Sequence, residues 1–170
     1  MVISTQQFYS GILKAPFGVL TVVASNKGVR YVMFENDAHP KPLSDVSIRQ
    51  GPHAVLDDAL VQLREYFNGD RVTFELPLDL VGTEFQVDAW KSLARIPFGK
   101  TVSYAEQAAS IGRPTAVRAI GGANGRNPVA VVLPCHRVIG ANGSLTGFGG
   151  GIEVKRWLLQ HEQNVMAGNR

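Results

Sequence analysis

The chain has 170 residues, of which 45% are hydrophobic and 18% are charged, as in one globular unit or two small subdomains with a sizeable core. Its single cysteine cannot form an internal disulfide or a four-cysteine zinc site, and its four histidines lack paired ligand spacing. We therefore expect no metal, no other cofactor and a cytoplasmic location. No stretch reaches the ~18 apolar residues of a membrane span, and residues 1–9 lack a secretion pattern, so we expect no membrane partner.

The net charge of +3 is unevenly distributed along the chain. Residues 1–82 carry seven Lys and Arg against nine Asp and Glu, a balance of −2, whereas residues 83–170 carry ten against five, a balance of +5. A basic surface attracts polyanions, so the second half is the part suited to nucleic acid. Because a mild basic excess is common, this feature is weak on its own.

The first part of the chain predicts a β-meander followed by a helix. Segments rich in β-branched and aromatic residues are separated by turn sequences, and a proline-containing loop follows at 35–52. An apolar stripe at spacings of four, three and four then predicts a helix that ends at Asn68. The predicted strands are 8–14, 19–24, 29–34 and 72–76, and the helical stripe is Leu56, Leu60, Leu63 and Phe67.

A domain boundary is predicted near residues 80–82, and the chain beyond it is predicted to be mostly helical. Thr83 suits the N-cap of a helix whose buried face is Phe85, Ala89, Trp90, Leu93 and Ile96. Two short helices are predicted at 103–110, with Ser103 as the N-cap, and at 115–124. They form a helix-turn-helix candidate, a pattern that many helical hairpins share without binding DNA. The last helix is predicted at 153–161 or slightly beyond, with Lys155, Leu159 and Glu162 on one side, and from spacing alone Glu162 is typical of a surface charge.

The second helix of this pair has small residues around one long cation, Arg118. Gly121 and Gly122 each cost a helix about 1 kcal/mol relative to alanine, so helix propensity does not explain them. Two interpretations stay open. The small residues could pack closely against another helix, or they could form a smooth surface that enters a nucleic-acid groove with Arg118 projecting from it.

Cys135 leaves an apolar run at 129–133 and is followed at once by His136 and Arg137. A thiolate is the reactive form, and a free cysteine with a pKa of about 8.5 needs a positive or hydrogen-bonding neighbour to react at neutral pH. A lone cysteine is more often an inert buried side chain, but the adjacent base and cation favour a nucleophile here. Further on, the glycine-dense segment 146–151 permits main-chain N–H groups to line a pocket.

The Cys135 segment reads Pro-Cys-His-Arg-Val, with Asn127-Pro128 before it and Gly147-Phe148-Gly149-Gly150 after it. In this it resembles the O6-alkylguanine-DNA alkyltransferases, which repair DNA by direct reversal. The match is dense over residues 83–162, and earlier residues are similar only in size and pattern. The resemblance implies an α/β (α+β) fold with an N-terminal ribonuclease-H-like domain at 1–82, made of a β-meander and a helix. It also implies a mostly helical, helix-turn-helix (winged-helix-like) domain at 83–170.

The function implied by the resemblance is transfer of an alkyl group from guanine O6 in duplex DNA onto Cys135, once and irreversibly, after the base is flipped out of the helix. His136 takes the thiol proton through a water, and Glu162 orients the imidazole. Arg118 fills the gap in the base stack, Tyr104 assists base rotation, and the second helix lies in the minor groove, which is narrow at ~6 Å. The implied partner is double-stranded DNA containing O6-alkylguanine, bound by a protein that is a monomer in solution.

The resemblance assigns a role to each of three groups of residues. The catalytic group is Cys135, His136, Glu162, Asn127 and Tyr104; the DNA-binding group is Arg118, Tyr104, Thr115, Ala119, Gly122, Arg126 and Arg137; and the substrate pocket is Val138, Phe148, Gly149 and Trp90. Phe148 and Gly149 depart from the family pattern, in which many members have tyrosine and serine there. The range of adduct sizes, activity on O4-alkylthymine and the number of copies on DNA stay open.

Three other functions are compatible with parts of this pattern. A cysteine hydrolase could use Cys135 and His136, although adjacent side chains in an extended segment point to opposite sides. A non-catalytic lesion-binding protein of the same fold would flip the base without accepting the alkyl group, but such proteins lack the cysteine. A helix-turn-helix regulator would bind one operator sequence and would not need Cys135.

Overall fold

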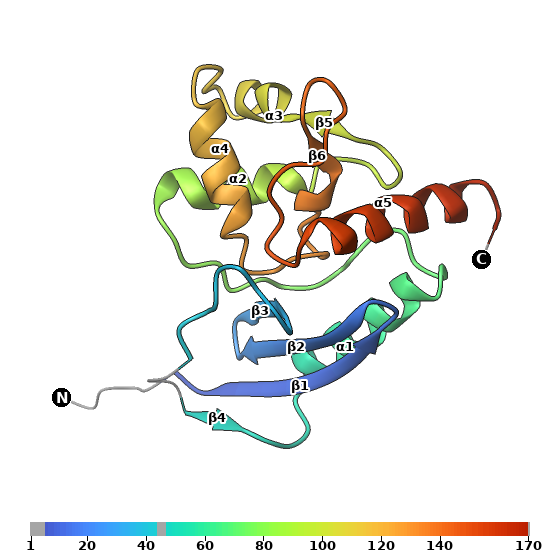
Figure 1. The fold of residues 1–170 in the computed structure, drawn as a ribbon. Coiled ribbons are helices and arrows are strands. Elements are labelled where there is room, and N and C mark those ends of the chain that lie inside the picture. Colours follow the sequence, from blue (N-terminus) through green and yellow to red (C-terminus); the bar gives the residue numbers. More distant parts are fainter. Residues whose placement is uncertain (1–5, 44–46, 170) are drawn as a thin grey trace.

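The computed structural model describes residues 6–43 and 47–169, and it has an N-terminal sheet with one helix and a C-terminal group of helices (Figure 1). Antiparallel strands β1 (Phe8–Ala15), β2 (Gly18–Ser25) and β3 (Gly28–Phe34) form the predicted meander, and the short β4 (Ile48–Arg49) pairs in parallel with β1 at the edge. The strand order is β3-β2-β1-β4. Parts of the predicted loop at 35–52 and of the segment 1–9, namely 44–46 and 1–5, lie outside the described residues.

Helix α1 (Ala54–Phe67) packs on this sheet. It begins where the His53 ring accepts a hydrogen bond from Leu56 N, and Asn68 caps its end as predicted. The predicted strand at 72–76 is wrong. The Gln62 side chain exchanges two hydrogen bonds with the backbone of Glu75, at 2.9 and 3.1 Å, so a side-chain amide replaces a partner strand there.

The second half contains α2 (Glu84–Leu93), β5 (Val102–Ser103), α3 (Tyr104–Ser110), α4 (Val117–Gly125), a 3-10 turn η1 (Cys135–Arg137), β6 (Val138–Ile139) and α5 (Ile152–Met166). Capping boxes at Thr83 and Ser103 begin α2 and α3, which confirms both predicted N-caps. Helix α4 starts later than predicted, because a turn closed by Ala116 N and Arg113 O (3.0 Å) precedes it. Ile96 is buried but lies beyond the end of α2.

One hydrophobic core joins the two halves. Its fully buried side chains include Leu20 and Leu63 from the first half and Leu93, Val131 and Leu158 from the second. Helix α5 lies along the border between the halves (Figure 1), so its buried face is positioned to meet side chains of both. No described helix is long and apolar enough to cross a membrane.

Candidate active site

Cys135 follows a tight turn that the side chain of Asn127 holds together. Asn127 Oδ1 accepts a hydrogen bond from Val129 N (3.0 Å), and its Nδ2 donates to Leu133 O (2.7 Å). Within this turn Val131 has a φ of 73°, a backbone conformation that is strained for a β-branched residue. The buried amide therefore fixes both ends of the segment that places Cys135.

His136 and Glu162 form a fully buried pair. His136 Nε2 lies 2.8 Å from Glu162 Oε1, and neither side chain is exposed to solvent. Burial by itself would raise the pKa of Glu162, but the hydrogen bonds and charges of His136 and Arg137 outweigh burial and hold that pKa at about 2. The ionised carboxylate needs a donor, so the imidazole proton resides on Nε2 and Nδ1 carries the lone pair. Among the described residues, His136 Nδ1 has no hydrogen-bond partner.

The protonation states around Cys135 follow from burial and from two lysines. Burial raises the pKa of the Cys135 thiol, and the Asn127 side chain, the Lys155 and Lys41 ammonium groups and a backbone N–H each lower it in part. Burial also lowers the pKa of His136. The resting site therefore holds a thiol next in sequence to a neutral imidazole with a free lone pair, the two groups that a nucleophile and its general base require.

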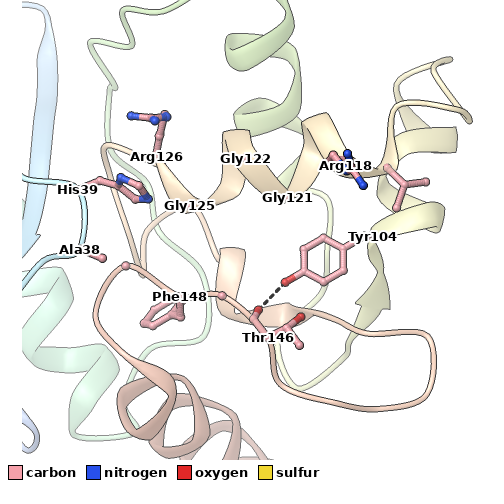
Figure 2. Close-up of a pocket in the computed structure, with 13 residues that line it drawn as sticks. Ala38, His39, Tyr104, Arg118, Gly121, Gly122, Gly125, Arg126, Thr146 and Phe148 are labelled. Atoms are coloured by element: carbon pink, nitrogen blue, oxygen red, sulfur yellow. Dashed lines mark hydrogen bonds between the residues drawn. The ribbon is translucent and has the colours of Figure 1, made fainter.

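A pocket of about 610 Å³ opens over α4 (Figure 2). Its lining comes from four parts of the chain: the outer face of α4, the start of α3, the glycine-rich loop before α5, and the segment after β3. The lining residues are Ala38, His39, Tyr104, Val117, Arg118, Gly121, Gly122, Gly125, Arg126, Thr146, Gly147, Phe148 and Gly149. A much smaller cavity of about 10 Å³ shares Gly125, Phe148 and Gly149 with it and reaches Cys135.

The glycines of α4 face this open space. A Cβ atom built on Gly121 or Gly122 would meet nothing within 4 Å in the described part of the chain. Close packing against another helix therefore does not explain these two glycines. Arg118 and Arg126 are exposed on the same pocket, so α4 presents a smooth surface flanked by two cations.

Comparison with known proteins identifies the family. A sequence profile described as the 6-O-methylguanine DNA methyltransferase ribonuclease-like domain matches residues 8–80, and one described as the DNA binding domain of the same family matches residues 84–164. The chain belongs to this methyltransferase family. It is 40% identical to the methylated-DNA–protein-cysteine methyltransferase of Methanosarcina barkeri, over 92% of this chain and 98% of that one.

Solved structures of family members have the same fold. The Mycobacterium tuberculosis OGT in complex with DNA superposes with a TM-score of 0.86 at 41% identity, covering 92% of this chain and 94% of that one. The O6-methylguanine-DNA methyltransferase of Pyrococcus kodakaraensis gives a TM-score of 0.62 at 20% identity, covering 91% of this chain and 98% of that one, which shows the fold alone. The α+β fold class predicted from the sequence is confirmed.

Two residues that were predicted to contact DNA or line the substrate pocket have structural roles instead. The first is Arg137. It is 6% exposed, its Nε and Nη2 donate to the Glu162 carboxylate at 2.8 to 3.1 Å, and its Nη1 donates to Ile96 O at 2.7 Å. The prediction that Arg137 contacts DNA is wrong. The 3-10 turn directs this side chain toward α5, so the cations that lower the thiol pKa are Lys155 and Lys41 instead.

Trp90 is the second. It is 3% exposed, and its Nε1 donates to Ala123 O at 2.8 Å, so it joins α2 to α4 and does not line the pocket over α4. The Val138 side chain is also fully buried, while its carbonyl accepts a 2.7 Å hydrogen bond from Lys155 Nζ. Thr115 and Ala119 are exposed residues before and within α4.

The two pocket residues that depart from the family pattern are held by the first half of the chain. The Phe148 ring packs against Phe34 at a centroid distance of 5.4 Å, and Gly149 O accepts a hydrogen bond from Ala38 N at 2.9 Å. A Cβ on Gly149 would come within 3.2 Å of Asp37 Oδ1, so glycine suits this close approach. Tyr104 borders the same pocket and donates to Thr146 O at 2.7 Å (Figure 2).

Three residues of the site, Lys155, Lys41 and Tyr66, were missed by sequence reasoning, and only the resemblance assigned Glu162 to it. Glu162 and Lys155 are both fully buried, although a surface charge was the expectation for Glu162 from spacing alone. Their positions three and four residues from the buried Leu158 are the signal that could have identified them. Lys41 and Tyr66 reach the site from the first half of the chain, and no local pattern in the sequence indicates that.

Proposed function

We propose that this protein repairs DNA by moving the methyl group of O6-methylguanine onto Sγ of Cys135. The S–C bond forms as the O6–C bond breaks, and the thiol proton passes through a water to His136 Nδ1. The departing guanine anion takes up a proton from water and is released as unmethylated guanine, and the His136 imidazolium returns its proton to the solvent. Because no step regenerates the thiol, each molecule reacts once. The observation that carries the proposal is the buried set of Cys135, a neutral His136 with a free Nδ1, and an ionised Glu162. Cys135 borders the small cavity that shares three lining residues with the pocket over α4, where two arginines are exposed.

The target base must leave the duplex to reach this thiol, since stacking and pairing enclose guanine O6. The glycine face of α4 has the smooth shape that approach to a minor groove of ~6 Å requires. Arg118 and Arg126 both border this pocket. In the proposed complex Arg118 fills the gap in the stack and Arg126 contacts phosphate. The Mycobacterium tuberculosis relative was solved with DNA, which supports DNA as the partner.

The test is the intact mass of the protein after incubation with a duplex that contains one O6-methylguanine. The expected product gains one methyl group in place of the thiol proton, with at most one methyl per molecule. Cys135→Ala should still bind the duplex and should gain nothing. Methyl gain by that variant would contradict the proposal, and repeated turnover on an ester or peptide would favour the hydrolase instead.

Two further properties are part of the proposal. The protein acts as a monomer in solution, and it works in the cytosol. Sedimentation of the free protein tests the first property, and fractionation of cells that express it tests the second.

A further inference from the structure

Tyr66 connects the N-terminal half of the chain to the buried carboxylate of the site. It lies on α1, its side chain is fully buried, and its hydroxyl donates to Glu162 Oε1 at 2.8 Å. The same oxygen lies 2.8 Å from His136 Nε2, and the Tyr66 hydroxyl lies 3.5 Å from that nitrogen. Tyrosine, carboxylate and imidazole therefore meet at one oxygen atom.

The position of the Tyr66 ring is fixed from several sides. The rings of Phe67, Phe74, Phe98 and His161 lie at centroid distances of 5.3 to 6.0 Å from it. His161 Nε2 also lies 2.7 Å from Tyr66 O, which joins α1 to α5 next to the glutamate. A ring held in this way directs its hydroxyl to one place, so the hydrogen bond to the carboxylate is preorganised.

The Tyr66 hydroxyl stays protonated at every working pH. Burial, followed by the neighbouring Glu162 charge, raises the pKa of Tyr66 well above its ordinary value. Tyr66 is therefore a permanent neutral donor. It does not line the pocket over α4, so it contacts neither the proposed DNA nor the lesion.

We propose that Tyr66 is a positioning residue for alkyl transfer, through which the ribonuclease-like half of the protein holds Glu162 and the His136 imidazole in the geometry for proton transfer. This inference rests on the proposed function. Tyr66 acts through Glu162, because its hydroxyl donates to that carboxylate at 2.8 Å and lies farther, 3.5 Å, from His136 Nε2. Without its hydroxyl, the carboxylate keeps the Arg137 guanidinium and the Gly99 N–H (3.1 Å to Oε2), but Oε1 loses one of its donors.

The sign of the expected pH effect follows from the groups around His136. Glu162 favours the imidazolium form, whereas Arg137 and Lys155 oppose it. The Tyr66 hydroxyl partly neutralises Glu162 Oε1, so its removal leaves more negative charge facing Nε2. The imidazolium is then favoured and the pKa of His136 rises. Since the neutral imidazole is the base, the acidic limb of the pH–rate profile moves to higher pH.

The experiment compares Tyr66→Phe with Tyr31→Phe, a control on β3 in the same half of the protein, where the ring packs under Arg30 at 5.5 Å. Single-turnover methyl transfer from duplex O6-methylguanine is measured across the acidic and neutral range, together with duplex affinity. Tyr66→Phe should lower the rate about tenfold, equivalent to about 1.4 kcal/mol of activation free energy. Its acidic limb should move to higher pH, with duplex affinity unchanged, and Tyr31→Phe should match the wild type.

A wild-type rate and profile in Tyr66→Phe would overturn the inference. A slower rate with an unmoved acidic limb would overturn it as well, because loss of packing alone would produce that result. An NMR titration of the His136 imidazole measures the pKa of His136 without any methyl transfer. An unchanged His136 pKa in Tyr66→Phe also contradicts the inference. A wild-type protein that transfers no methyl group while its His136 pKa still responds to Tyr66→Phe would refute the proposed function and not the role of Tyr66 in holding the imidazole.

Discussion

Replacement of Glu162 by glutamine tests the buried charge network. Glu162 is fully buried and accepts hydrogen bonds from His136, Arg137, Tyr66 and Gly99 N. Glutamine keeps the size of the side chain but removes the charge, so Arg137 becomes a buried cation without a counter-ion. Breaking a buried pair in this way costs about 3 to 5 kcal/mol. We therefore expect Glu162→Gln to unfold at a lower urea concentration than the wild type at neutral pH.

The pH dependence of this loss identifies its cause. The pKa of Glu162 falls from 4.5 to about 2 in the folded protein. A carboxyl group whose pKa is lowered by folding stabilises the folded protein at pH values above the pKa that the group has in the unfolded chain. For Glu162 this contribution is about 3 kcal/mol, and it is lost as the pH falls from 4.5 toward 2. When the pH is lowered from about 5 to about 3, the free energy of unfolding of the wild type should fall by about 2 kcal/mol through protonation of Glu162. Glu162→Gln lacks this titrating group, so its free energy of unfolding should not fall for this reason.

The assay is urea unfolding of both proteins at these two pH values, with Glu65→Gln as the matched control. Glu65 pairs with Arg71 at 2.6 Å on the surface, so its loss should cost less than about 1 kcal/mol. The stability gap between wild type and Glu162→Gln should narrow at low pH. A gap of equal size at both pH values would refute the assignment of Glu162 as an ionised partner of Arg137.

Three more variants address the thiol and the DNA face. Lys155→Met removes a cation that lowers the Cys135 pKa, so thiolate absorbance should appear at higher pH, and an unmoved titration would contradict that electrostatic role. Gly122→Ala should stabilise α4 by up to about 1 kcal/mol in thermal unfolding, because the added Cβ atom would meet no other atom within 4 Å. The same variant should bind the DNA duplex more weakly. Equal or tighter duplex binding would contradict the proposal that Gly122 faces the groove. Arg118→Ala should slow transfer from duplex DNA more than transfer from a free base analogue, and equal losses on both substrates would exclude a role in base flipping.

Local signals in the sequence predicted most of the elements. β-branched strands with glycine turns predicted the meander, and Thr83 and Ser103 predicted two helix starts because a side-chain oxygen there accepts from the first turn. The segment 72–76 has strand composition, but the Gln62 amide binds its backbone and no strand forms. Composition cannot show a partner that folding brings from elsewhere in the chain.

The same limit applies to the site. The Pro-Cys-His-Arg-Val string indicated the nucleophile and its base, but the direction of Arg137 depends on a 3-10 turn that the string does not specify. Tyr66 and Glu162 are 96 positions apart, and Lys41 approaches Cys135 through a loop with no regular pattern. These contacts depend on how the two halves pack together, so they required the structure.

Peptide mapping of the reacted protein tests the central claim most directly. After incubation with an excess of duplex DNA that contains O6-methylguanine, the protein is digested and the masses of the peptides are measured by mass spectrometry. The account predicts one added methyl group, located on the Cys135 peptide alone, and one unmethylated guanine in the DNA for each methylated protein. A methyl group on any other residue, or guanine restored while the Cys135 peptide keeps its original mass, would contradict it.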